Sequence, residues 1–145
     1  MEMSTAYLLG RLMFALDREA ERLLQDQVGV SYKRILFLTV LRDFGTVTQH
    51  ELAVALGYSD PAVSVMLGEL TKDGLVATAP SATHGRKRLV SITPKGAEVV
   101  TRGRRVLDTS FDELLVRAEV DGQRLRESAA RLYQAVLAKG KQGNA

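Results

Sequence analysis

The sequence predicts a mainly α-helical protein that carries one small β-hairpin. Apolar residues recur at helical spacing along most of the 145 residues. Capping residues and glycines divide this pattern into six expected helices, and one stretch of alternating polarity, 75–93, separates the fourth helix from the fifth. No run of about 18 apolar residues is present, so a membrane helix is not expected. The N-terminus lacks the pattern of a signal peptide, and we expect a cytoplasmic protein.

The first two helices are predicted over 4–26 and from Ser31 to about Phe44. In the first, apolar residues return every three or four positions, which is typical of an amphipathic helix. Ser31 is a suitable N-cap for the second helix. Because that helix is apolar nearly all round, we expect it to be buried in the core.

Two short helices follow and are joined by a tight turn at 57–59. Thr48 and Glu51 form a capping-box pattern at the start of the first. The second is expected to start at Asp60 as its cap, with Pro61 in the first helical position. Two short helices joined in this way predict a helix-turn-helix. The inward stripe of its second helix is Val63, Met66, Leu67 and Leu70.

A hairpin and two long helices complete the chain. Strands are expected over 75–79 and 87–93, on either side of a loop at 80–85. A long helix then starts at Pro94 and runs to about residue 118, and Asp121 caps the last helix. The residues expected to face inward on this last helix are Leu125, Ala129, Leu132 and Val136.

Composition argues against enzymes and metal sites. The chain has no cysteine, which excludes disulfides and thiol chemistry within it. Its two histidines, His50 and His84, have no metal-ligand spacing. No nucleophile–base pair or phosphate-binding loop is visible, so neither catalysis nor a cofactor is expected.

Positive charge is concentrated in one place. The net charge is +3, yet 48–71 contains three acidic residues and no Lys or Arg, whereas Arg86, Lys87 and Arg88 are consecutive. This cluster fits a surface that meets a nucleic acid. It also fits a solvated edge strand protected by charge. Farther along, Arg102 and Arg104 are expected to pair with Glu98 and Asp108 at helical spacing.

Two segments resemble the MarR family of winged helix-turn-helix repressors. Residues 48–76 read TQHELAVALGYSDPAVSVMLGELTKDGLV and resemble its helix-turn-helix; residues 88–96 read RLVSITPKG and resemble its second wing strand and the exit from it. The resemblance implies a winged helix-turn-helix at 31–93, flanked by dimerisation helices at 1–30 and 94–145. It also implies a homodimer that binds palindromic double-stranded DNA, represses transcription and is released by a small organic ligand.

The resemblance assigns DNA contacts to the second short helix, the start of the first, and the wing. Many members carry Asp-x-Arg in the wing, where this chain has His84-Gly85-Arg86, and many carry an arginine where this chain has Val65. Val65 and its neighbours suit hydroxyl and thymine-methyl contacts, and Arg86 suits a narrow minor groove. The expected DNA-binding residues are Thr48, Gln49, Ser59, Ala62, Ser64, Val65, Lys72, Arg86, Lys87 and Arg88.

An aromatic or carboxylate ligand is expected to bind between the dimer helices and the DNA-binding domain. Arg11 would suit its carboxylate. The expected lining residues are Tyr7, Arg11, Phe14, Tyr32, Phe37 and Phe111. For each of these residues taken singly, packing within the core or a dimer is the better explanation.

The missing arginine at Val65 and the acidic helix-turn-helix leave a second function open. On this alternative, the chain is a winged-helix dimer that binds a protein or a ligand and has lost strong DNA binding. His84, if protonated, would add charge to the wing.

Overall fold

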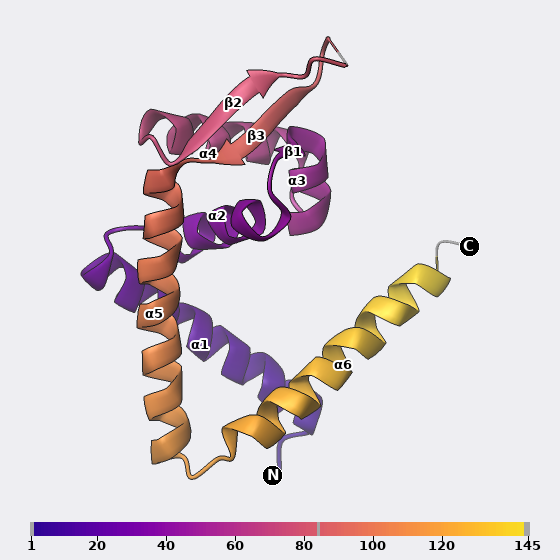
Figure 1. Ribbon diagram of the computed structural model, residues 1–145. Coiled ribbons are helices and arrows are strands. Elements are labelled where there is room, and N and C mark those ends of the chain that lie inside the picture. The colour runs from indigo at the N-terminus through magenta and orange to yellow at the C-terminus, as the bar shows by residue number, and fades with distance from the viewer. Residues whose placement is uncertain (1, 84, 144–145) are drawn as a thin grey trace. The chain divides into compact units, whose positions relative to one another are not determined.

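Residues 2–83 and 85–143 are described by the computed structural model, and they form six helices and three strands (Figure 1). His84, and with it the question of a protonated wing, lies outside the described residues. The chain divides into two compact units, Met1–Leu107 and Asp108–Ala145. The elements are α1 (Thr5–Gln27), α2 (Tyr32–Phe44), β1 (Val47–Thr48), α3 (Gln49–Leu56), α4 (Asp60–Lys72), β2 (Val76–Pro80), β3 (Arg88–Ile92), α5 (Pro94–Arg117) and α6 (Gly122–Gln142).

The expected order of helices and hairpin is confirmed, and most of the expected caps are present. Ser31 and Asp121 accept hydrogen bonds from backbone amides in the first turns of α2 and α6. The cap of α4 was misassigned, because Ser59 caps that helix and Asp60 is already helical. Ser59 has extended backbone angles and its hydroxyl accepts from the Ala62 amide at 3.3 Å, which is the geometry of an N-cap.

The sheet has three antiparallel strands in the order β1-β3-β2. Val76 of β2 pairs with Ile92 of β3, and the ladder continues to Pro80 opposite Arg88. The third strand, β1, was not predicted. It is only two residues long, and Val47 pairs with Val90. The wing is therefore anchored to the start of α3 through β3.

The core of the first unit lies between the helix-turn-helix, α2 and the sheet. Each of these elements contributes apolar side chains with almost no exposed surface, and Val100 of α5 joins them. The inward stripe predicted for α4 is confirmed. The prediction for α2 holds on one side only, because Leu36 and Phe44 are exposed. The fully buried side chains are Leu24, Phe37, Leu38, Leu41, Leu52, Val63, Leu70, Val90 and Val100.

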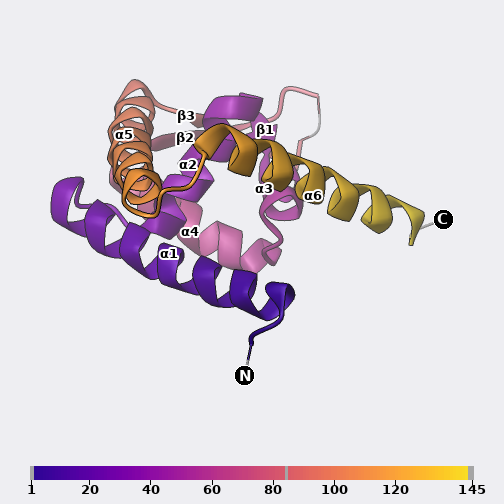
Figure 2. The same cartoon turned by 90° about the horizontal axis from the view of Figure 1, so that it is seen from below.

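Helices α1 and α2 are in contact (Figure 2), and the first half of α5 packs closely against them. A Cβ atom on Gly103 would lie 2.8 Å from Ile35 Cδ1 and 3.3 Å from Leu24 Cδ2. A Cβ atom on Gly96 would lie 2.1 Å from the Leu75 carbonyl oxygen. Both glycines are therefore required by close approach rather than by backbone conformation.

The second unit contains the end of α5 and the whole of α6. A Cβ atom on Gly122 would lie 3.1 Å from Leu115 Cδ1, so the turn between the helices is tight. The inward face predicted for α6 is not buried in the single chain. Leu125, Leu132 and Val136 are exposed by 39%, 60% and 68%, and Ala129 is also exposed.

Candidate nucleic-acid interface

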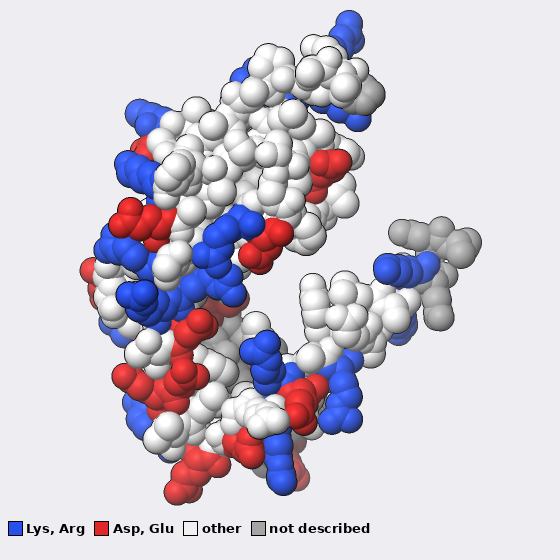
Figure 3. All heavy atoms as spheres, in the orientation of Figure 1, with Lys and Arg blue, Asp and Glu red and all other residues white. Residues whose placement is uncertain are grey.

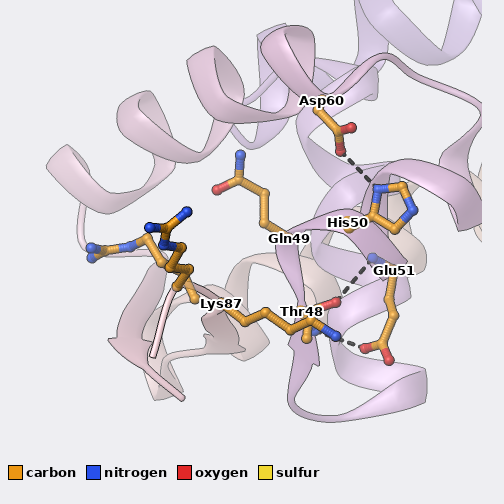
Figure 4. Close-up of a pocket in the computed structure, with 8 residues that line it drawn as sticks. Thr48, Gln49, His50, Glu51, Asp60 and Lys87 are labelled. Carbon is orange, nitrogen blue, oxygen red and sulfur yellow. Dashed lines mark hydrogen bonds and ion pairs between the residues drawn. The ribbon is translucent and has the colours of Figure 1, made fainter. Parts of the chain in front are cut away.

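A groove lies between the start of α3, the start of α4 and the wing. It is lined by Thr48 at the end of β1, 49–51 of α3, Asp60 of α4, and Arg86, Lys87 and Arg88 of the wing (Figure 4). Segments as far apart in sequence as 48 and 88 meet here because β1 leads directly into α3 and pairs with β3. The groove thus joins the helix-turn-helix to the basic cluster.

The start of α3 is fixed by its capping box. Thr48 Oγ1 accepts from the Glu51 amide at 3.1 Å, and the Thr48 amide donates to Glu51 Oε2 at 2.8 Å. Gln49 extends from this turn into the groove (Figure 4). A helix N-terminus with a neutral amide side chain beside it suits a phosphate oxygen.

The wing supplies the positive side of the groove. Arg86, Lys87 and Arg88 are all exposed. Arg88 is held in place, since its Nη2 donates to Thr78 Oγ1 on the adjacent strand at 2.9 Å. The Ser81 amide donates to the Lys87 carbonyl at 2.8 Å and closes the base of the wing loop.

Two carboxylates also line the groove. Asp60 Oδ1 lies 3.2 Å from His50 Nδ1, and the two side chains face one another across the first turns of α4 and α3 (Figure 4). The His50 and Asp60 side chains are exposed by 75% and 58%. Glu51 is the second acid, so the groove combines three basic side chains with two acidic ones. The His50–Asp60 contact was not predicted, because a separation of ten residues leaves no local signal.

The outer face of α4 continues the surface beyond the groove. Ser64, Val65, Gly68 and Lys72 are exposed, and Ala62 is half-buried. Val65 is exposed by 67%. The expected DNA-binding residues therefore fall into two sets: one on the groove, and one on this face. Ser59 is exposed but does not line the groove, and its hydroxyl accepts from the Ala62 amide as the cap of α4.

The far end of α4 is held by an arginine that the sequence did not single out. Arg34 Nη1 lies 2.7 Å from Asp73 Oδ2, and Arg34 Nη2 lies 3.2 Å from Glu69 Oε2. Although burial acts to lower the pKa of the Arg34 guanidinium, hydrogen bonds to Asp73 and Glu69 raise it above its ordinary value. Separations of more than 30 residues explain why no sequence pattern revealed these pairs.

The expected ligand-binding residues of the first unit are not gathered into one site. Tyr7, Arg11 and Phe14 are exposed on α1, where the Arg18 guanidinium lies 5.9 Å from the centre of the Phe14 ring. Phe111 is exposed by 38% and belongs to the second unit.

The remaining two candidates lie on α2. Phe37 is fully buried and stacks on Tyr58 with ring centres 5.5 Å apart, so the prediction that it lines a cleft is wrong for this conformation. Tyr32 is half-buried, and burial followed by the charge of Asp17 raises the pKa of its phenol.

Within 2–83 and 85–143, no helix is long and apolar enough to cross a membrane. Across the same residues, no cluster of three or more His, Asp and Glu side chains could hold a metal ion.

Comparison with known proteins gives consistent results. A family model described as MarR family matches residues 28–87. An uncharacterized HTH-type transcriptional regulator from Mycobacterium leprae is 30% identical over 131 residues, which cover 89% of this chain and 92% of that protein. Another, from Mycobacterium bovis, is 31% identical over 108 residues, covering 74% of this chain and 76% of that protein. These relatives are named as regulators of transcription, not as enzymes.

Solved structures confirm the fold. A crystal structure of a MarR mutant from E. coli superposes with a TM-score of 0.80 at 18% identity, covering 94% of this chain and 98% of that one. The MepR–DNA complex from S. aureus superposes with a TM-score of 0.75 at 21% identity, covering 94% and 99%. The winged helix-turn-helix expected from the sequence is the fold of these proteins.

Proposed function

This chain belongs to the MarR family of transcriptional regulators, and we propose that it acts in the cytoplasm as a homodimeric repressor. It binds palindromic double-stranded DNA and leaves that DNA when a small organic ligand binds. Residues 31–93 form the DNA-binding domain, and 1–30 and 94–145 contribute the dimerisation helices. No cofactor takes part.

The observation that carries this proposal is the groove between the helix-turn-helix and the wing. If α4 enters a major groove with its exposed face, the wing meets the next minor groove, and one sugar–phosphate strand runs between them. The phosphates of that strand then pass Gln49 and the basic cluster at Arg86–Arg88. The S. aureus relative MepR has been solved in a complex with DNA, which supports the same use of this surface.

Exposed apolar side chains support the homodimer. On α1 they include four side chains that are each exposed by 44–55%: Leu8, Leu9, Leu12 and Met13. On α6 Leu132 and Val136 are more exposed still. Large apolar patches on two separate helices are uncommon on a monomer and typical of an association surface. A second copy of the chain would cover them and account for the helical spacing of these residues.

The effector is proposed to be a small aromatic or carboxylate compound. Tyr7, Phe14, Tyr32 and Phe111 offer aromatic surface, and Arg11 offers a guanidinium that can pair with a carboxylate. Phe37 would contribute only after leaving the core. Such a ligand would lower DNA affinity if it bound more tightly to a dimer conformation in which the two α4 helices do not match the spacing of successive major grooves.

The test is selection of bound DNA from a random duplex pool, followed by a salt titration on the selected sequence. We expect a palindromic site whose half-sites lie about 34 Å apart or a multiple of that distance. Affinity should fall steeply with salt, and less steeply for Arg86→Ala. Sedimentation should give a dimer, and candidate aromatic acids should release the DNA. Recovery of no sequence at low salt would overturn the proposal.

A second function has one observation in its favour. Asp60 and Glu51 place two carboxylates on the groove, and Val65 offers no positive charge to DNA. A winged-helix dimer that binds a protein or ligand would tolerate both features. This alternative predicts a dimer that retains no DNA sequence in the same selection, so one experiment separates the two.

A further inference from the structure

Arg34 connects the first turn of α2 to the last turns of α4. Its guanidinium contacts two carboxylates, Glu69 and Asp73, which are four residues apart and therefore lie on one face of the helix end. The Arg34 side chain is exposed by only 26%, less than the arginines of the other ion pairs in the described residues. A planar guanidinium that contacts two groups in this way fixes orientation as well as distance.

The same turn of α2 also contacts α1 and α5. The Tyr32 amide donates to Glu21 Oε2 of α1 at 2.8 Å. One residue beyond Arg34, Ile35 is buried where α5 passes at Gly103. Residues 31–35 therefore lie between the long helices and the end of α4.

The core contacts of α4 do not fix its orientation completely, so polar contacts at its end can restrain it further. Val63, Met66, Leu67 and Leu70 form one apolar stripe that presses the helix against the core. A stripe of this kind sets the depth of the helix and the side that faces the core, and directional polar contacts at the helix end restrain its remaining rotation and tilt. At the C-terminal end those contacts include Arg34 and Lys95, whose Nζ donates to the Asp73 carbonyl at 3.0 Å.

We propose that Arg34 is a positioning residue for DNA binding, which fixes the rotation and tilt of α4 relative to α1 and α5. In a dimer this contact sets the spacing at which the two α4 helices meet successive major grooves. The inference rests on the proposed function, and it assigns to Arg34 the discrimination between half-site spacings rather than a contact with DNA.

The test compares operators whose half-site spacing is changed by one base pair in each direction. The wild-type chain should prefer one spacing, and Arg34→Ala should reduce that preference by about threefold to tenfold. Arg42→Ala is the matched control, because Arg42 lies on the same helix and contacts Thr101 of α5 instead of α4. It removes the same charge and should retain the preference.

Two conservative variants guard against simple misfolding. Arg34→Lys keeps the charge but loses the planar guanidinium that contacts two carboxylates at once. Its spacing preference should lie between those of the wild type and Arg34→Ala. Glu69→Gln removes one charged contact of an exposed side chain and should also give an intermediate value. A fall in affinity that is equal at all spacings would overturn the proposal, because lost stability alone has that effect.

A measurement without DNA keeps this inference separate from the proposed function. Amide hydrogen exchange over 60–75 should become about fivefold faster in Arg34→Ala than in Arg42→Ala, while exchange over 49–56 stays equal. Equal exchange over 60–75 in the two variants would overturn the positioning role. Failure of the wild-type chain to bind any DNA would instead overturn the proposed function, and the exchange result would still decide whether Arg34 fixes α4.

Discussion

Helix α4 and the wing are neighbours with opposite chemistry. The exposed face of α4 has small and apolar side chains, Ser64, Val65 and Gly68, and its first basic residue is Lys72 near the end. The wing has Arg86, Lys87 and Arg88 in succession, and Figure 3 shows basic side chains at its tip above a largely uncharged surface. If both regions bind DNA as proposed, the difference divides the work between them.

Each chemistry acts over its own range. Positive charge attracts any phosphate backbone over about 8–10 Å at moderate salt and carries no sequence information. Hydroxyl and methyl contacts act only on touching a base and discriminate between bases. We therefore expect the wing to supply most of the salt-dependent affinity and α4 to supply sequence preference, a division that substitutions can test.

The largest effect is expected from removing the basic cluster. The variant Arg86→Ala, Lys87→Ala, Arg88→Ala should bind its operator about 100- to 1000-fold more weakly near 0.1 M salt, because up to three phosphate or minor-groove contacts are lost. The slope of log affinity against log salt should be shallower by about two to three. Fluorescence anisotropy across a salt series measures both quantities.

The control for this variant is Arg22→Ala on α1, where the guanidinium is paired with Glu19 and Asp26. It should leave the slope unchanged. An unchanged slope in the triple variant would contradict the assignment of charge to the wing.

A smaller effect is expected from giving α4 the charge it lacks. Val65→Arg places a guanidinium on its exposed face, where it can bind guanine by two hydrogen bonds, and affinity for sites with guanine opposite should rise about tenfold. The matched control is Val54→Arg on α3, because Val54 and Val65 are exposed by 69% and 67%. The measurement is selection of bound DNA from a random pool with each variant. If Val65→Arg selects the same sequence as the wild type, Val65 does not face the bases.

A still smaller effect is expected at Asp60. Its carboxylate lies on the groove that the phosphates would pass, so Asp60→Asn should strengthen binding about threefold by removing repulsion. The helix would lose a favourable charge in its first turn, at a cost of about 0.5 kcal/mol in stability. Glu98→Gln on α5 is the control, and weaker binding by Asp60→Asn would indicate that the carboxylate contacts a base instead.

The smallest effect concerns the stability of the fold at high pH. It must be known before the DNA affinity of α4 or wing variants is compared at different pH values. The pKa of Tyr32 is raised above its ordinary value of 10.0 by burial and by Asp17. The folded state therefore favours the neutral phenol, and this contribution is complete below pH 10 and lost as the pH rises through the raised value. Above pH 10, Tyr32→Phe should lose less of its free energy of unfolding than the wild type does, as measured by urea titration at each pH. The same pH dependence of the unfolding free energy in both proteins would contradict this.

The local parts of the fold could be predicted from the sequence, since caps and glycines mark helix ends within a few residues. The capping box of Thr48 and Glu51 and the cap of Asp121 were found because each depends on neighbours in sequence. β1 was missed because two residues are too few to show any periodicity.

Long-range contacts could not be predicted in the same way. Arg102 and Arg104 were expected to pair along their own helix, but Arg102 donates to the Gln27 carbonyl and Arg104 lies 3.9 Å from Asp43. The spacing of Leu132 and Val136 indicates a face that favours burial, yet it cannot tell whether this chain or another covers it. The candidate interface was half predicted: the basic cluster is visible in sequence, whereas the His50–Asp60 contact depends on the turn between α3 and α4.

The two close approaches of α5 restrict how that helix can move. Gly96 lies against the Leu75 carbonyl and Gly103 against Leu24 and Ile35, about 10 Å apart along the helix axis. Sliding would bring the larger flanking side chains into these narrow points, so axial travel of the first half of α5 is blocked. The first half of α5 is therefore a fixed axial reference for the rest of the first unit.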